Sequence, residues 1–505
     1  MTKVIINNWN KGIVNDPRIT QRDYSMVLSN VDTFTKPNQL LPIPSKVSGN
    51  DKNTVADLQK FAVGKWIDED YKLFALGTQS GNSKAKLLYK DMTDLDDDSW
   101  NQPSNGEQTG GGYTLFDLFV YYERTGSFYG ARDHQYIWAY DSTSNTFTDS
   151  EEDLTSFGNI AQGLVHSKDD ILYIPYDNKI AKNNNGSWTS EALTLPEEFY
   201  VTSICEYGNY LAIAGAPINK DGNSRVWLWD RDSTLTTLSE SIDFGDGELL
   251  ILEKVEGVLV GITKKGGSTI YVDDKIIFRY YIGGSFAKKY LELESDLFTY
   301  LLQDKQKVNN RLLFLMGGTF DGVYRVGLWA ISRVADGIAL VQEEKVINDT
   351  EILKGSNAIL GFYKIGDCTF IAYTDISNDE QVSKTDVSGQ QFSYYGATSV
   401  WETTINPSMP IADRSANKQL LGVRVHYSPL PTSAKEIKLY YRVNGGSWTE
   451  IFTDDIDNST FTEKIKDANG SNFSTGREYE FKLEFKGDVE IAELTYSYKT
   501  IESQI

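Results

Sequence analysis

The sequence has little cysteine and little histidine, and this limits the chemistry that the chain can carry. Its 505 residues include two cysteines, Cys205 and Cys368, and three histidines. Two cysteines far apart in the sequence make neither a disulfide framework nor a metal-binding spacing. Three histidines leave little material for an imidazole metal site or a Ser-His triad. We therefore expect no bound metal and no cofactor.

Long apolar runs and an excess of positive charge are also missing. No stretch reaches the ~18 apolar residues that a membrane-spanning helix needs, and the first residues lack the apolar segment of a signal peptide. Lys and Arg number 49 against 71 Asp and Glu, which gives a formal net charge of -22. Because nucleic-acid binding depends on Lys and Arg that neutralise phosphates, this balance argues against specific nucleic-acid binding. We expect a protein made in the cytoplasm without a signal peptide and without membrane contact.

Aromatic residues are abundant in the sequence, whereas proline and methionine are scarce. The chain has 30 Tyr, 23 Phe and 10 Trp, against 12 Pro and 5 Met. Aromatic side chains suit the half-buried pleated surface of a sheet, so the composition favours an all-β protein. A chain of 505 residues also exceeds what one compact core usually supports. We therefore expect one large repetitive domain with an addition, or two domains.

A short apolar strand that ends in small or turn residues recurs along the chain. The starts of its copies lie roughly 40 to 55 residues apart, the range of a four-stranded propeller blade. Tight turns such as Gly208-Asn209 and Gly366-Asp367 connect a preceding strand to each copy. The copies are KLFALGTQSG from Lys72, DILYIPYDN from Asp170, NYLAIAGAP from Asn209, GVLVGITKKGG from Gly257, RLLFLMGG from Arg311 and CTFIAYTD from Cys368.

This recurrence predicts a β-propeller of about seven blades over residues 50–405. Each unit grades from apolar to polar strands, as a blade needs when its inner strands are buried and its outer strand meets water. Six or eight blades stay open, because the outer strands near Phe147 and Ala287 are weakly marked. A pair of β-sandwiches is the structural alternative, although it does not predict a 40–55-residue recurrence.

The pattern changes after residue 405. Residues 406–418 gather Pro, Asn and Ser, which is typical of a linker. Residues 419–505 alternate apolar with polar positions in short runs, and YYRVNGGSWTEI at 440–451 is a hairpin signal. This size and pattern predict a small β-sandwich, separate from the propeller.

The N-terminal sequence carries two further motifs. An aromatic-x-x-Gly-Ile turn precedes Asp-Pro-Arg, and an Asp-x-Phe-Thr-x-Pro-Asn segment follows. This start resembles that of bacteriophage virion proteins with a propeller, and it is similar to the start of tail nozzle or tubular proteins of short-tailed phages. The motif residues are Trp9, Gly12, Ile13, Asp16, Pro17 and Arg18, followed by Asp32, Phe34, Thr35, Pro37 and Asn38.

The resemblance implies a structural protein of the virion, in a tail or tail adaptor. Its implied partners are other virion proteins and copies of itself within the particle, after synthesis in the host cytoplasm. The chain is short for a nozzle and lacks a large insertion between blades, so a tip, adaptor, spike or decoration stays open.

Residues 1–49 are predicted to form an extended strap. Asp16-Pro17 and Lys36-Pro37 break any helix and favour extended geometry. The strap can lie across the propeller or reach a neighbouring subunit, and the alternative is a strand that closes the last blade. The residues predicted to act in assembly are Trp9, Gly12, Ile13, Asp16, Pro17, Arg18, Phe34 and Pro37.

Two other functions need consideration. Exposed aromatic side chains such as Tyr441 and Trp448 could bind a host-surface glycan, which makes a recognition module the alternative function. Propellers also carry glycosidases, which need two carboxylates roughly 5 to 10 Å apart. Sialidase-like propellers repeat an Asp-box, whereas the nearest stretch here, NKDGNSRVW at 219–227, occurs once. We therefore predict no catalytic residues and no enzyme, and a glycosidase is the less favoured alternative.

Overall fold

The computed structural model describes most of the chain, and its regular structure there is almost entirely β-strand. One 3-10 helix, η1 (Ile411–Asp413), is the exception among the described residues. The described residues are 2–6, 9, 25–33, 39–44, 46–48, 57–78, 84–95, 99–108, 118–219, 222–232, 234, 238, 240–266, 275–294, 299–320, 323–334, 337–346, 359–374, 380–385, 387–388, 391–392, 398–428, 430, 435–454, 464–469 and 473–501.

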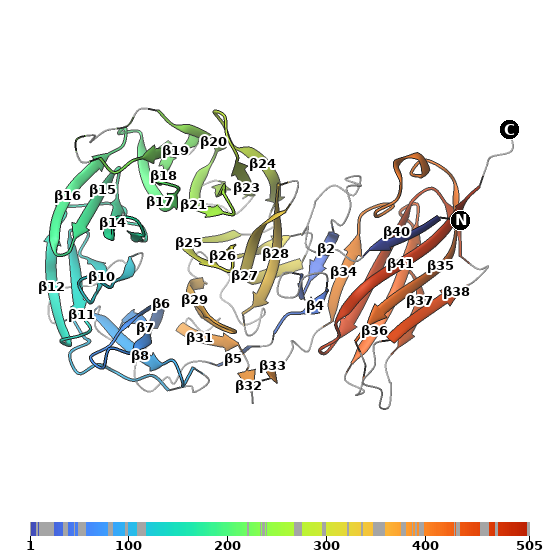
Figure 1. Cartoon of the computed structure of the whole chain (residues 1–505), viewed down its shortest axis with the longest axis horizontal. Helices are drawn as coiled ribbons and strands as arrows, with labels where there is room; N and C mark the ends of the chain where they lie inside the picture. Colours follow the sequence, from blue (N-terminus) through green and yellow to red (C-terminus); the bar gives the residue numbers. More distant parts are fainter. Residues whose placement is uncertain are drawn as a thin grey trace. The chain divides into compact units, whose positions relative to one another are not determined.

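Seven antiparallel sheets follow one another around a ring (Figure 1), which confirms the predicted propeller of about seven blades. In blade 1, residues 101–107 take the fourth position by bridging β8 at Lys86 and Tyr89. The first four blades are β6 (Asp57–Lys65), β7 (Tyr71–Thr78) and β8 (Ala85–Asp91); β9 (Phe119–Tyr122), β10 (Ser127–Arg132), β11 (Tyr136–Asp141) and β12 (Thr146–Asp153); β13 (Leu164–His166), β14 (Ile171–Tyr176), β15 (Lys179–Asn184) and β16 (Ser187–Thr194); and β17 (Phe199–Tyr207), β18 (Tyr210–Pro217), β19 (Asn223–Trp229) and β20 (Ile242–Asp246).

The last blade is completed by a strand from the N-terminal segment. Blade 5 holds β21 (Glu248–Val255), β22 (Val258–Lys265), β23 (Lys275–Tyr281) and β24 (Lys288–Glu294), and blade 6 holds β25 (Thr299–Val308), β26 (Arg311–Phe320), β27 (Val323–Val334) and β28 (Gly337–Lys345). Blade 7 joins β29 (Ile359–Ile365), β30 (Cys368–Thr374) and β31 (Glu380–Thr385) to β5 (Lys46–Ser48). The Lys46 ammonium donates to the Thr369 carbonyl and to the Thr385 hydroxyl, each at 3.1 Å. A blade-closing strand therefore exists, but it lies at residues 46–48.

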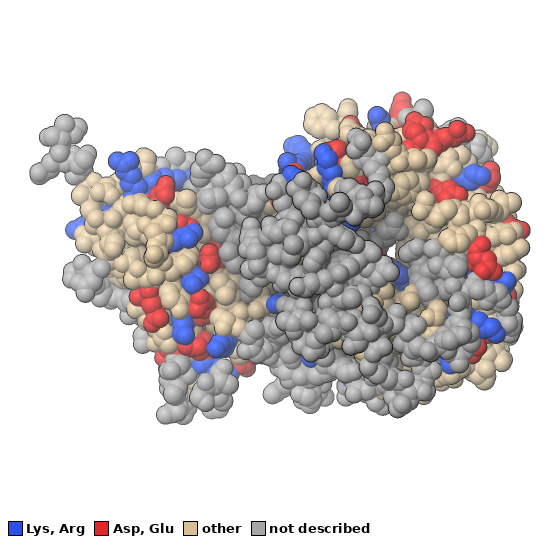
Figure 2. Space-filling model, turned by 180° about the vertical axis from the view of Figure 1, so that it is seen from behind, with Lys and Arg blue, Asp and Glu red and all other residues tan. Residues whose placement is uncertain are grey.

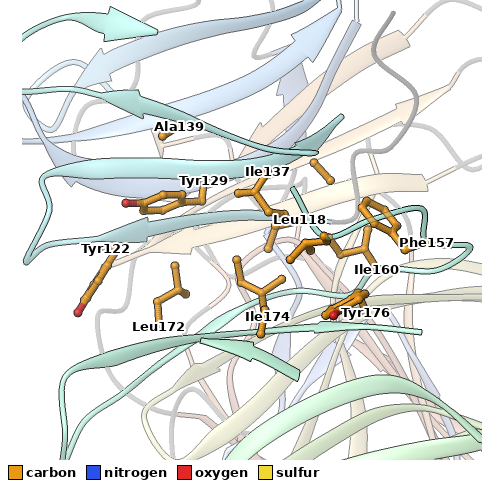
Figure 3. Packing of buried hydrophobic residues seen from close by; sticks show 13 residues of the cluster. Leu118, Tyr122, Tyr129, Ile137, Ala139, Phe157, Ile160, Leu172, Ile174 and Tyr176 are labelled. Atoms are coloured by element: carbon orange, nitrogen blue, oxygen red, sulfur yellow. The ribbon is translucent and has the colours of Figure 1, made fainter. Parts of the chain in front are cut away.

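Apolar side chains fill the space between neighbouring blades. Between blades 2 and 3 they come from strands of both sheets and from residues beside those strands, and they point toward one another (Figure 3). Burial of each large apolar side chain stabilises the fold by about 1.5 to 3 kcal/mol. The cluster comprises Leu118, Tyr122, Tyr129, Ala131, Ile137, Ala139, Leu154, Phe157, Ile160, Leu172, Ile174, Tyr176 and Ala181.

Two five-stranded sheets make the sandwich, and each includes a strand from the N-terminal segment. One sheet has the order β1-β41-β35-β38, with β39 paired to β35, and the other has the order β2-β34-β40-β36-β37. The strands are β1 (Thr2–Ile6), β2 (Ser25–Ser29), β34 (Ser399–Thr403), β35 (Lys418–Tyr427), β36 (Glu436–Val443), β37 (Thr449–Asp454), β38 (Lys464–Asn469), β39 (Thr475–Gly476), β40 (Tyr479–Lys486) and β41 (Ile491–Thr500). Two short ribbons, β3 (Val31–Asp32) with β4 (Leu41–Pro42) and β32 (Val387–Ser388) with β33 (Gln391–Phe392), complete the strands.

Contacts divide the chain into two units. The first comprises Met1–Ser45, Gly327–Lys345 and Ser388–Ile505, and the second comprises Lys46–Val326 and Val346–Val387. The boundaries predicted from the sequence were 1–49, 50–405, 406–418 and 419–505, and the observed units differ from them. Strand β34, within the range predicted as propeller, pairs with β40 of the sandwich over Ser399–Glu402. The difference arises because strand pairing joins segments that are distant in the sequence.

The segment predicted as a linker, 406–418, is packed into the sandwich unit. Asn406 and Met409 are buried. The Asn406 side chain accepts from the Tyr479 amide at 3.0 Å and donates to the Arg477 carbonyl at 3.0 Å. The Lys418 ammonium donates to three carbonyls of the same segment, at 2.8 to 3.1 Å. These bonds fix the segment within the sandwich unit, whereas its composition predicts a linker between two domains.

Candidate functional site

The first residue of the N-terminal aromatic-x-x-Gly-Ile motif lies in the core of the sandwich unit. Trp9 is 1% exposed, and its ring meets that of Trp401 on β34 edge to face, with centroids 4.8 Å apart. Such aromatic pairs add to the stabilisation that burial alone gives. The other predicted assembly residues, Gly12, Ile13, Asp16, Pro17, Arg18, Phe34 and Pro37, lie outside the described residues.

The strands on either side of this motif are edge strands of the two sandwich sheets. On β1, Val4 and Ile6 are buried whereas Ile5 is 46% exposed, so the strand buries one face. Asn30 follows β2 directly. Its carbonyl accepts from the Ser399 hydroxyl at 2.8 Å, and its side chain donates to the Thr398 carbonyl at 3.0 Å. Strands β1 and β2 of the predicted strap are thus structural parts of the sandwich, whereas β5 belongs to blade 7.

The two aromatic residues predicted to bind a glycan differ in exposure. Tyr441 is only 5% exposed, and its ring packs edge to face on Phe473, so the expectation of an exposed Tyr441 is corrected. The reason is strand alternation: on β36, Leu439 and Tyr441 face the core, whereas Tyr440 and Arg442 face outward. Trp448 is partly exposed.

Tyr440, Arg442, Trp448 and Lys482 form an aromatic-cation group on the outer face of this sheet, which we call the Trp448 platform. The Arg442 guanidinium lies 4.5 Å from the centroid of the Trp448 ring, and the Lys482 ammonium lies 5.4 Å from it. The same ammonium lies 4.3 Å from the centroid of the Tyr440 ring. Tyr440 is not among the residues predicted from the sequence, although the period of two along YYRV could have assigned it to the outer face.

Carboxylates surround the platform. Arg442 pairs with Glu480 at 2.5 Å, Lys482 pairs with Glu484 at 2.6 Å, and the Tyr440 hydroxyl donates to Glu484 at 3.1 Å. Glu402 lies opposite Lys482 in the strand register. Burial raises the pKa of the Glu402 carboxyl, and this effect exceeds the opposing effect of Arg442 and Lys482. The face therefore combines aromatic rings with acidic and basic groups in similar number.

A second candidate site is a cavity of about 230 Å³ at the centre of the propeller unit. It is lined by the innermost strands β6, β9, β25 and β29. The Lys60 ammonium, from blade 1, pairs with Asp304 of blade 6 at 2.5 Å. Between them on blade 7, Gly361 permits a close approach, because a Cβ there would lie 2.9 Å from the Asp304 carboxylate and 2.2 Å from the Gln59 carbonyl.

Other polar groups at this centre link blades to one another. Lys305 pairs with Glu253 at 3.0 Å and donates to the Ile204 carbonyl at 2.7 Å. The Gln306 side chain bonds both the amide and the carbonyl of Lys364, each at 2.8 Å. Gln162 does the same for Phe119, at 3.1 and 2.6 Å. These contacts tie the ring together, and they can also offer polar groups to a small ligand.

No group of three or more His, Cys, Asp or Glu suited to a metal ion is found in the part of the chain that the structure describes. Within that part, no helix has the length and apolar character to cross a membrane. Cys205 is buried, and burial raises the pKa of its thiol.

No family model and no curated protein matches the chain. Among solved structures, the chain is similar to a glycoside hydrolase family 43 arabinoxylan arabinofuranohydrolase from Bacillus subtilis in complex with cellotetraose, with 10% identity and a TM-score of 0.31 over 90% of this chain and 99% of that one. It is similar to an exo-beta-1,3-galactanase from Phanerochaete chrysosporium with galactose, with 9% identity and a TM-score of 0.31 over 90% and 100%. It is also similar to the Dos1 propeller, with 11% identity and a TM-score of 0.40 over 68% and 95%.

The fold places the chain among the β-propeller proteins, with a β-sandwich added. The prediction that the protein is not an enzyme is corrected, because glycoside hydrolases are among the structures that it resembles. At these identities and TM-scores, the similarity assigns neither a reaction nor a substrate to this chain.

Proposed function

We propose that the protein is a structural component of a bacteriophage particle, in the tail or tail adaptor. In this role it is made in the host cytoplasm and assembles with other virion proteins and with copies of itself. The observation that carries the proposal is the position of Trp9. This first residue of the virion-like motif is a core residue of the sandwich, flanked by strands that complete both of its sheets. Such a position supports a structural role for the N-terminal segment.

Exposed apolar side chains supply a surface suited to protein partners. In the turn between β23 and β24, Ile282 is 57% exposed and Phe286 is 68% exposed. Neighbouring exposed apolar residues of this kind favour contacts with other proteins. In Figure 2, the coloured Lys and Arg residues lie interspersed with Asp and Glu, which suits protein contacts better than binding to a polyanion.

The proposal is tested by fractionating infected cells on a density gradient. We expect the protein to sediment with intact particles at a fixed ratio to the major capsid protein, and Phe286→Asp to reduce that ratio. Ile218→Asp, at an exposed residue of the propeller, serves as the matched control and should leave the ratio unchanged. Recovery of the wild-type protein only in the soluble fraction would contradict the proposal.

A further inference from the structure

The outer face of the sheet β2-β34-β40-β36-β37 presents an ordered row of polar and aromatic groups. Strand pairing places Glu402 opposite Lys482 and Lys482 opposite Tyr440. It also places Arg442 opposite Glu480. Glu402, Tyr440, Arg442 and Lys482 alternate with residues buried in the sandwich core, so their side chains share the outer face. Strand alternation places Glu480 on the same face, where it is buried.

Trp448 lies over the cations of this face. Arg442 and Lys482 stand on neighbouring strands of the sheet, and both cations lie within 5.4 Å of the ring centroid. A cation over an aromatic ring is attracted to the ring face, so the two hold the indole in a preferred orientation. A side chain that is oriented before a ligand arrives loses less entropy on binding. The platform therefore presents a preorganised and partly exposed aromatic ring.

Hydrogen-bonding groups lie next to the ring. The Lys482–Glu484 ion pair and the Tyr440 hydroxyl bring donors and acceptors to its edge. Glu480, which pairs with Arg442, is buried. A pyranose offers a C–H face that can pack on an indole and hydroxyls that both donate and accept. Because both cations of the platform have a carboxylate partner, the platform offers no unpaired positive charge to an acidic sugar.

We infer that the Trp448 platform is a binding site for a neutral oligosaccharide, with a pyranose ring stacked on Trp448. Tyr440 then extends the aromatic surface toward an adjacent sugar unit, and the Glu484 carboxylate accepts bonds from its hydroxyls. This inference goes beyond a structural role in the particle. It depends on the described geometry of the sandwich alone, so it can be tested on the purified protein.

The test is binding of the full-length protein to an array of neutral hexose and N-acetylhexosamine oligomers, with uronic-acid oligomers for comparison. The best neutral oligomer is then titrated by calorimetry. We expect Trp448→Ala to weaken its binding by roughly tenfold or more, and Trp448→Phe to retain part of it. Tyr210→Ala, an exposed tyrosine in the propeller, is the matched control and should bind as the wild type does.

Three results would overturn the inference. They are no binding of any neutral oligomer by folded protein, equal binding by Trp448→Ala, and binding confined to the uronic-acid oligomers. Circular dichroism confirms that each variant is folded. Failure of this test leaves the gradient experiment on particle incorporation unaffected, because that experiment measures a different property.

Discussion

At the scale of single residues, the N-terminal tryptophan links the sequence motif to the stability of the sandwich. Trp9 is buried against Trp401, and replacing a buried tryptophan with alanine removes contacts and leaves a cavity. We expect Trp9→Ala to lower the free energy of unfolding of the sandwich by about 3 to 5 kcal/mol. Urea denaturation followed by circular dichroism measures the change. Ile5→Ala, at an exposed position of the adjacent strand, should change stability by no more than about 0.5 kcal/mol, and equal effects of the two variants would contradict the account.

Glu402 provides a prediction on pH. Burial raises the pKa of its carboxyl above the ordinary value of 4.5. Well below pH 4.5, the carboxyl is protonated in both the folded and the unfolded chain. Between 4.5 and the raised pKa, the folded chain keeps a proton that the unfolded chain has lost. The free energy of unfolding therefore falls as the pH rises through this interval. Glu402→Gln cannot ionise at this position, so it should not show this loss. Its melting temperature should rise relative to that of the wild type as the pH is raised from 4 to 7. Glu450→Gln, at an exposed residue, is the control, and a parallel profile for Glu402→Gln would refute the prediction.

The sequence predicts Tyr441 and Trp448 as possible surface-binding residues. The structure shows Trp448 partly exposed and Tyr441 buried, and binding at Trp448 stays a prediction. The sequence alone marks both as aromatic, and only the register of β36 decides which of Tyr440 and Tyr441 faces the core. The cations beneath Trp448 come from two strands, and Lys482 lies too far along the chain for spacing to reveal the contact.

At the scale of elements, the propeller strands can be predicted from the sequence, but the pairing of strands distant in the sequence cannot. The recurring apolar strands correspond to β7, β14, β18, β22, β26 and β30, the second strand of their blades. Their periodicity is local, so it can be read from the sequence. The pairing of β1 with β41 joins the two ends of the chain, and that of β5 with β31 joins residues 46–48 to residues 383–385. No local pattern encodes such pairings.

The packing of segment 406–418 predicts how readily a protease cleaves it. Its Asn406 is buried, has φ +49°, and bonds Tyr479 and Arg477 through its side chain. Alanine tolerates this conformation less well and leaves the Tyr479 amide without that partner. We expect Asn406→Ala to speed thermolysin cleavage within 406–418, whereas the wild type resists. The control Asn417→Ala, at an exposed residue, should resist cleavage too, and rapid cleavage of the wild-type segment would show that it is not packed as described.

At the scale of the whole molecule, the chain forms a seven-bladed propeller and a sandwich that both use strands from the first 48 residues. This organisation makes the N-terminal segment a structural requirement, and the proposed function places the molecule in a phage particle. The most direct test is a cryo-electron microscopy map of the purified particle. We predict density in the tail into which both the propeller and the sandwich fit, repeated by the symmetry of the tail. A map at side-chain resolution in which every tail density is accounted for by other proteins would contradict the account.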